Sequence, residues 1–166
     1  MKKIAVYATN MGAAKNVCEK IAPALGIDEV VDVKNFSLKD LANYDKILLV
    51  VSTHVVGEIQ KDFNAQIQDF KDLDLTNKTV ALVTLGDGVA HGEAFNDALG
   101  ELYDICSANN ATLVGNSDPE NYTFEETDSI RDGVFPGLAL DVENEDHLTD
   151  SRIKTWLAND VKVAFE

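Results

Sequence analysis

Ile47-Leu48-Leu49-Val50-Val51 decides the fold, because all five residues are apolar and polar residues stand on both sides of the run. Val80-Ala81-Leu82-Val83 is a second run of the same kind. Strands that are apolar throughout are typical of the centre of a parallel sheet, where helices cover both faces. We therefore expect these two runs to be neighbouring central strands.

Shorter apolar stretches and helical patterns alternate on either side of these runs. Further strands are expected at 4–8, 30–33, 112–114 and 136–140, and helices at 14–25, 94–107 and from about 149 to 161. Thr149 or Asp150 is the expected cap of the last helix, and Pro23 is expected to kink or shorten the end of the first. This alternation predicts one α/β domain over residues 1–166, with a doubly wound parallel sheet.

Composition limits the classes of partner. The 166-residue chain has a formal net charge of −15, which repels nucleic acid and anionic membranes and favours a partner with a basic surface. No apolar run approaches the length that spans a bilayer. Cys18 and Cys106 have neither disulfide-framework nor metal-site spacing, so we expect buried, reduced thiols in a cytoplasmic protein.

The three histidines of the chain each follow an expected strand. His54 lies in Thr53-His54-Val55-Val56-Gly57, His91 in Gly86-Asp87-Gly88-Val89-Ala90-His91, and His147 in Glu143-Asn144-Glu145-Asp146-His147. The carboxyl ends of parallel strands meet at one edge of a sheet, where α/β proteins bind their ligands. All three histidines are therefore expected beside one ligand site.

The chain resembles the long-chain flavodoxins over essentially its full length. The resemblance rests on Gly137-Leu138-Ala139-Leu140-Asp141 with the segment 148–156, on Phe95-Asn96-Asp97-Ala98-Leu99-Gly100, and on the polar insertion 116–134, which matches the long-chain loop that splits strand five. It implies a flavodoxin-like three-layer α/β/α fold with a five-stranded parallel sheet in the order 2-1-3-4-5. It also implies an FMN site, which makes an electron-transfer or cofactor-carrier protein a better expectation than a self-sufficient enzyme.

The resemblance and the expected meeting of the loops at one sheet edge together assign cofactor-binding roles to a set of loop residues: Thr9, Asn10, Gly12, Thr53, His54, Val55, Gly57, Gly86, Asp87, His91 and His147. Two groups depart from the family pattern. In the phosphate loop, Met11 and Ala14 replace two hydroxyl residues. At the two positions where the family stacks aromatic rings on the flavin, this chain has His54 and His91.

Imidazoles on both sides of a flat slot predict axial ligands, since histidine is a standard ligand of haem iron. Our leading hypothesis from the sequence is a carrier or redox protein that binds haem, or a similar flat metallomacrocycle, with His54 and His91 as metal ligands and His147 as an accessory. A bare zinc, copper or nickel site would need a third ligand, for which His147, Asp87 or Glu58 are candidates. Ordinary loop histidines are the other interpretation.

Two further functions remain open from the sequence. One is a soluble, low-potential FMN electron shuttle with weakened FMN affinity, and the other is an interaction module that has no cofactor. The partner is expected to be a redox or haem-handling protein with a basic surface. The acidic residues of the insertion are candidates for docking it: Asp118, Glu120, Glu125, Glu126, Asp128 and Asp132.

Overall fold

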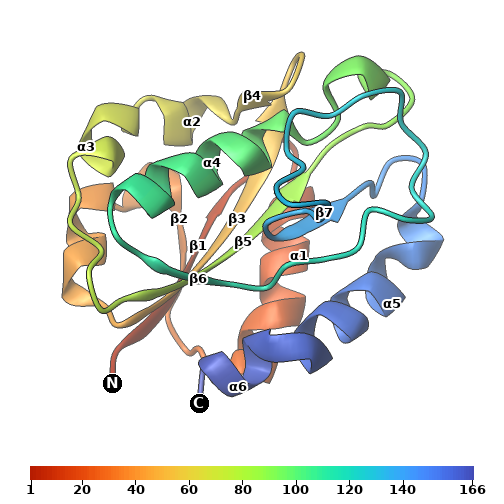
Figure 1. The fold of residues 1–166 in the computed structure, drawn as a ribbon. Helices are drawn as coiled ribbons and strands as arrows, with labels where there is room; N and C mark the ends of the chain where they lie inside the picture. The colour runs from red at the N-terminus through yellow and green to blue at the C-terminus, as the bar shows by residue number, and fades with distance from the viewer.

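The computed structural model describes residues 1–166 and is built around one sheet (Figure 1). Its strands are β1 (Lys3–Ala8), β2 (Val30–Asp32), β3 (Lys46–His54), β4 (Glu58–Ile59), β5 (Thr79–Leu85), β6 (Thr112–Val114) and β7 (Leu138–Leu140). The parallel strands run in the order β2-β1-β3-β5, and β6 and β7 pair with opposite ends of β5. The expected order 2-1-3-4-5 is therefore confirmed, with the fifth strand split by the insertion.

The central position of β3 explains its composition. Ile47 stands beside Ile4 of β1 on one side and beside Val80 of β5 on the other. Every residue from Ile47 to Ser52 is buried. Side chains of a strand point alternately to the two faces of the sheet, so a strand covered on both faces needs apolar residues at successive positions.

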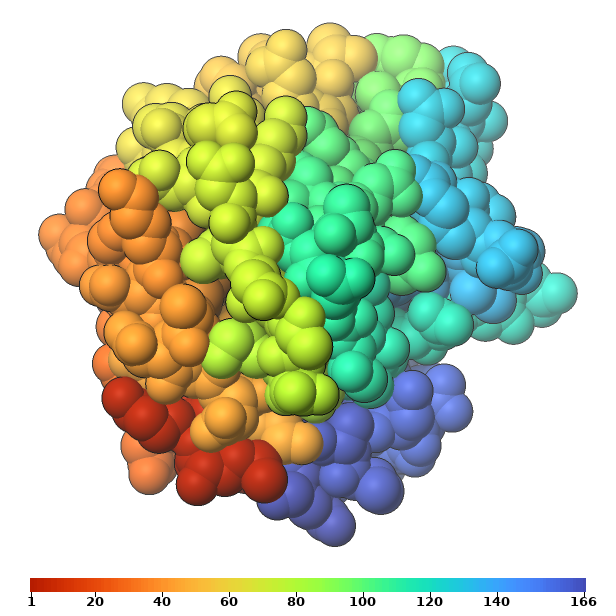
Figure 2. Space-filling view, turned by 60° about the vertical axis from the view of Figure 1, so that its left-hand side comes forward, coloured from red at the N-terminus to blue at the C-terminus, as the bar shows by residue number.

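Helices cover both faces of the sheet and give the three expected layers (Figure 1). The α-helices are α1 (Ala13–Ile21), α2 (Lys61–Asn64), α3 (Ile67–Lys71), α4 (Asp97–Ala108), α5 (Asp146–Trp156) and α6 (Lys162–Ala164). Residues of α2, α3 and α4 form one core with Ile4, Leu49 and Leu82, whereas residues of α1 and α5 form a second core with Leu48 and Val83. Figure 2 looks at the side of α3 and α4 and shows the insertion, in cyan, projecting beyond α4.

Three helix boundaries differ from the sequence prediction. The first helix leaves α-geometry at Ile21 and finishes as a 3₁₀ turn over Ala22–Leu25, which contains Pro23. Helix α4, which was expected from residue 94, begins at Asp97. Asn96 adopts a left-handed conformation, and a separate 3₁₀ turn spans Gly92–Ala94. The last begins at Asp146, so Thr149 lies inside it and caps nothing.

Shorter elements complete the chain. Further 3₁₀ turns span Val33–Asn35 and Leu38–Asn43, and a π-helical turn over Leu157–Val161 joins α5 to α6. The antiparallel strand β4 was not expected from the sequence, and neither were the short helices α2 and α3. No helix of the structure combines the length and apolar character that crossing a bilayer requires.

Candidate functional site

A groove of about 290 Å³ opens at the carboxyl edge of the sheet, where β1, β3 and β5 end. Its lining consists of Asn10, Met11, Ala13, Ser52, Thr53, Val55, Leu85, Gly86, Asp87, His91, Val142 and Glu143. Ligand pockets usually occupy about 300–1,000 Å³, so this groove is just below the small end of that range. Its place is the ligand site expected for a doubly wound sheet.

One end of the groove is the turn from β1 into α1. Gly12 precedes the helix with φ 101°, a left-handed conformation that a side chain would strain, and no side chain caps the helix. The hydroxyl of Thr9 accepts a hydrogen bond from the Gly12 N–H at 2.8 Å, which closes the turn. Uncapped N–H groups at a helix N-terminus, together with the helix dipole, form a binding place for an anion.

The middle of the groove is held by hydrogen bonds between loops. Asn10 Nδ2 donates to the Thr53 carbonyl at 3.0 Å, and Thr53 Oγ1 donates to the Leu85 carbonyl at 2.8 Å. These bonds join the ends of β1, β3 and β5 across the groove. These hydrogen bonds between protein groups hold the walls of the groove in place.

The far wall is a hairpin between β3 and β4. His54 pairs with Glu58 in the antiparallel ladder, and Val55 turns the chain with φ 40°. Gly57 has φ 71°, and a Cβ there would lie 2.9 Å from the Cβ of Asp97 at the start of α4. The hairpin therefore presents Val55 to the groove, whereas Gly57 packs against α4.

The loop after β5 carries the most polar part of the lining. Asp87 Oδ1 accepts bonds from the N–H groups of Val89 (3.0 Å) and Ala90 (2.8 Å) and from Asn144 Nδ2 (2.7 Å). The His91 N–H bonds the Asp87 carbonyl at 3.0 Å. Partial burial acts to raise the pKa of Asp87, but these hydrogen bonds and the nearby His91 outweigh it and lower the pKa.

The structure separates the residues that the sequence analysis grouped together. Six of them line the groove, namely Asn10, Thr53, Val55, Gly86, Asp87 and His91, and Thr9 and Gly12 form its end. Gly57 and His54 belong to the hairpin and are not among the lining residues. His147 is exposed in the first turn of α5 and lies outside the groove.

Sequence reasoning missed the support behind the Asp87 loop. Asp141 is buried and accepts bonds from the Gly88 N–H (3.0 Å) and from the N–H and side-chain amide of Asn144. It therefore ties the loop after β5 to the chain after β7. The signal was available, since Asp141 follows the apolar strand 138–140 as Asp87 follows β5.

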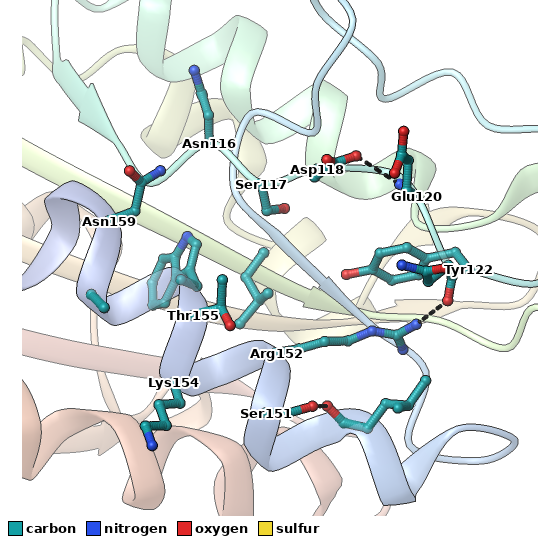
Figure 3. Close-up of a pocket in the computed structure, with 15 residues that line it drawn as sticks. Asn116, Ser117, Asp118, Glu120, Tyr122, Ser151, Arg152, Lys154, Thr155 and Asn159 are labelled. Atoms are coloured by element: carbon teal, nitrogen blue, oxygen red, sulfur yellow. Dashed lines mark hydrogen bonds between the residues drawn. The ribbon is translucent and has the colours of Figure 1, made fainter.

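A larger cavity of about 870 Å³ lies elsewhere, between the insertion and α5 (Figure 3). Arg152 lies 3.7 Å from the ring centroid of Tyr122, pairs with Glu145 at 3.3 Å and donates to the Asn121 carbonyl at 2.8 Å. The Tyr122 hydroxyl donates to the Ala139 carbonyl at 2.7 Å, and burial raises its pKa to about 12. Trp156 Nε1 donates to the Gly115 carbonyl at 2.6 Å. The bond from Tyr122 to Ala139 anchors the insertion to β7, and the bond from Arg152 to Asn121 anchors it to α5.

The chain is similar to known proteins over nearly all of its length. A family model described as Flavodoxin matches residues 6–156. Flavodoxin 1 of Azotobacter vinelandii is 39% identical over 166 residues, with 95% of each chain covered, and the flavodoxin of Helicobacter pylori is 34% identical over 158 residues, again with 95% of each covered. The crystal structure of Fusobacterium nucleatum flavodoxin bound to flavin mononucleotide matches with a TM-score of 0.91 and 35% identity over 100% of both chains.

The expectation that haem binds between His54 and His91 is wrong. The similar proteins are flavodoxins, and the matching Fusobacterium structures hold flavin mononucleotide. The geometry gives a physical reason, because axial ligation needs an imidazole on each side of one slot. His91 lines the groove, whereas His54 belongs to the β3–β4 ladder. Neither histidine belongs to a group of three His, Cys, Asp or Glu residues that could hold a metal ion.

The family is shown by three agreeing observations. The sheet order with its split fifth strand, the match across residues 6–156 and the identity of 39% to a curated relative point to the same group of proteins. The chain belongs to the flavodoxin family.

Proposed function

We propose that this protein binds FMN in the groove at the carboxyl edge of the sheet and carries electrons between redox partners. The observation that carries the proposal is the uncapped N-terminus of α1, which opens beside a groove with fixed walls. The similarity to flavodoxins, including one bound to flavin mononucleotide, supports the choice of cofactor.

The phosphate end of the groove fits a dianion. A phosphate at the start of α1 would meet backbone N–H groups and the positive end of the helix dipole. The missing Cβ of Gly12 leaves open space, because no heavy atom beyond its two chain neighbours lies within 4 Å of the place that it would occupy. Met11 is 98% exposed in the same turn and offers no hydrogen bond, so we expect weaker phosphate binding than a hydroxyl residue would give.

The ring end of the groove fits a flat group with polar edges. Val55, Leu85 and Val142 supply apolar surface, and Asp87 and the loop it closes supply polar groups. No phenylalanine, tyrosine or tryptophan lines the groove, so a bound flavin ring would stack on aliphatic groups and on the imidazole of His91. FMN supplies one-electron and hydride chemistry when bound, and the chain positions it and sets its electrostatic surroundings.

The partner remains a prediction. A net charge of −15 favours a protein with a basic surface, and long-range attraction would speed their encounter. A cytoplasmic location also remains a prediction; both cysteines are free and buried, in different cores on opposite faces of the sheet, and burial raises the pKa of each thiol to about 12.

Titration of the apo-protein with FMN tests the proposal. We expect one FMN per chain, quenching of flavin fluorescence, and weaker binding of riboflavin, which lacks the phosphate. The loaded protein should then be reduced and reoxidised reversibly. Failure to bind FMN, or equal affinity for FMN and riboflavin, would contradict the site as we describe it.

A further inference from the structure

The groove has an unusual charge composition. Its lining contains the carboxylates of Asp87 and Glu143 and the imidazole of His91, and it contains no lysine or arginine. Glu93, Glu125 and Glu126 lie in or against the same loop, since the N–H groups of Glu125 and Glu126 bond the Gly92 carbonyl at 2.9 and 2.8 Å. His91 is therefore the only lining residue that can carry a positive charge.

The position of His91 is fixed by its loop. The turn from Asp87 to His91 is closed by the His91 N–H and by three hydrogen bonds to Asp87 Oδ1, one of them from Asn144. The carboxylate of Asp141 also holds that turn, because it accepts hydrogen bonds from the Gly88 N–H and from the side-chain amide of Asn144. The imidazole is consequently placed at the groove by the rigid end of β5.

Reduction of a bound flavin changes the charge of the groove. An electron that leaves the bound ring anionic would add a negative charge to a groove that two carboxylates already line. Beside the two lining carboxylates, Asp87 and Glu143, such a charge is costly in a partly buried site unless a positive charge is near. An imidazole is the side chain that gains such a charge between about pH 5 and 8.

We propose that His91 is the charge-compensating residue of this carrier: its imidazole takes up one proton from solvent when the bound ring becomes anionic. One electron comes from the reductant and one proton from water, so the net charge of the groove is unchanged. The proton leaves again when the electron passes to the acceptor. The inference rests on the proposed FMN site and assigns to one of its residues a role that stacking alone does not require.

His54 and His147 are the natural comparison for His91. His54 faces Glu58 across the β3–β4 hairpin and does not line the groove, and His147 is exposed at the start of α5. Both carry the same imidazole side chain as His91, but neither belongs to the groove. An effect of protonation on the cofactor should therefore follow His91 alone.

The test measures the midpoint potential of the FMN-loaded protein between pH 5.5 and 8.5, in the wild type and in the variants His91→Gln, His54→Gln and His147→Gln. Coupling of one proton to one electron adds up to about 59 mV per pH unit to the slope for the couple that forms the anionic ring. We expect this extra slope in the wild type and in the His54 and His147 variants, and its loss in His91→Gln. Protonation of the flavin itself contributes equally to the slopes of the wild type and of His91→Gln, so it cancels in the difference between them.

NMR of the wild type gives a readout that needs no variant of the site. The titration midpoint of the His91 ring protons should lie about one pH unit or more higher in the reduced protein than in the oxidised protein. The ring protons of His147 should titrate at the same pH in both states.

Three results would overturn the inference. Equal slopes in wild type and His91→Gln, an unchanged His91 titration on reduction, or loss of the extra slope in His54→Gln instead would each remove His91 from this role. Each of these results requires FMN to be bound, so they differ from failure of the proposed function, which would appear as no FMN binding at all.

Discussion

Two cavities of the molecule, one between the insertion and α5 and the other the groove at the carboxyl edge of the sheet, differ in size and in what their polar groups do. The larger, of about 870 Å³, is walled by Arg152, Tyr122 and Trp156, whose polar atoms already bond to neighbouring protein groups. The smaller, of about 290 Å³, opens on an uncapped helix N-terminus and on a charged loop. Unpaired donors and convergent polar groups mark a binding site better than volume does.

The comparison predicts that the larger cavity matters for stability and not for FMN. Trp156→Ala should lower the free energy of unfolding by about 3–5 kcal/mol, because it empties a buried site and leaves the Gly115 carbonyl without its indole donor. Urea unfolding followed by circular dichroism measures this. Trp156→Phe is the milder control, and both variants should bind FMN as the wild type does. A large loss of FMN affinity in the folded Trp156→Phe protein would contradict the prediction that the larger cavity does not affect FMN binding.

At the smaller cavity, Met11→Thr should strengthen FMN binding by about tenfold or more. A hydroxyl that bonds a charged phosphate contributes about 1.5–3 kcal/mol, and about 1.4 kcal/mol is a factor of ten in affinity. Met11→Val is the matched control, since it has the shape of threonine without the hydroxyl. Riboflavin affinity should be the same in all three proteins. A gain for riboflavin as large as the gain for FMN would show that the phosphate is not the group in contact.

The two histidines of the family's stacking positions should respond unequally. His91→Tyr should improve FMN binding by about 0.5–1.5 kcal/mol, because a phenol ring offers more stacking surface than imidazole and His91 lines the groove. His54→Trp should gain less, since His54 is held in the β3–β4 ladder. Isothermal titration of both variants measures the difference. The opposite ranking would mean that the hairpin moves to meet the cofactor.

The smallest expected effect concerns Asp87 and pH. Its pKa is lowered in the folded state, so its charged form stabilises the fold above the unfolded value of about 3.9, and this contribution is lost as pH falls through the lower, folded value. Because Asp87 is partly exposed, we expect less than about 1 kcal/mol. At pH 7 the wild type should be more stable than Asp87→Asn. In strong acid the two proteins should have the same thermal unfolding midpoint. A difference that persists there would assign the effect to hydrogen-bond geometry instead of charge.

Much of the fold could be predicted from short stretches of sequence. The apolar runs in β3 and β5 gave the centre of the sheet, because only strands covered on both faces tolerate such runs. The start of α5 was mistaken, since Thr149 and Asp150 look like caps in sequence, but the helix begins at Asp146 without a side-chain cap.

The site was harder to predict than the fold. The rule for parallel strands put Asp87 and His91 at the sheet edge, where both line the groove. The haem hypothesis failed because sequence position gave His54 and His91 equal roles, whereas β3 continues through His54 into an antiparallel hairpin. That pairing depends on the turn at Val55 and on the packing of Gly57 against α4, which periodicity does not reveal.

The central claim, that FMN occupies the smaller groove, is tested most directly by NMR during FMN titration. Trp156 is the single tryptophan and lines the larger cavity, so its indole N–H resonance reports on that cavity. The amides of Gly86 in the groove lining, of Gly12 in the turn at its end and of Gly88 in the loop after β5 report on the groove. The account predicts large shifts of the three glycine amides, saturating at one FMN per chain, with the indole resonance unmoved. A shifted indole resonance with unmoved glycine amides would contradict it.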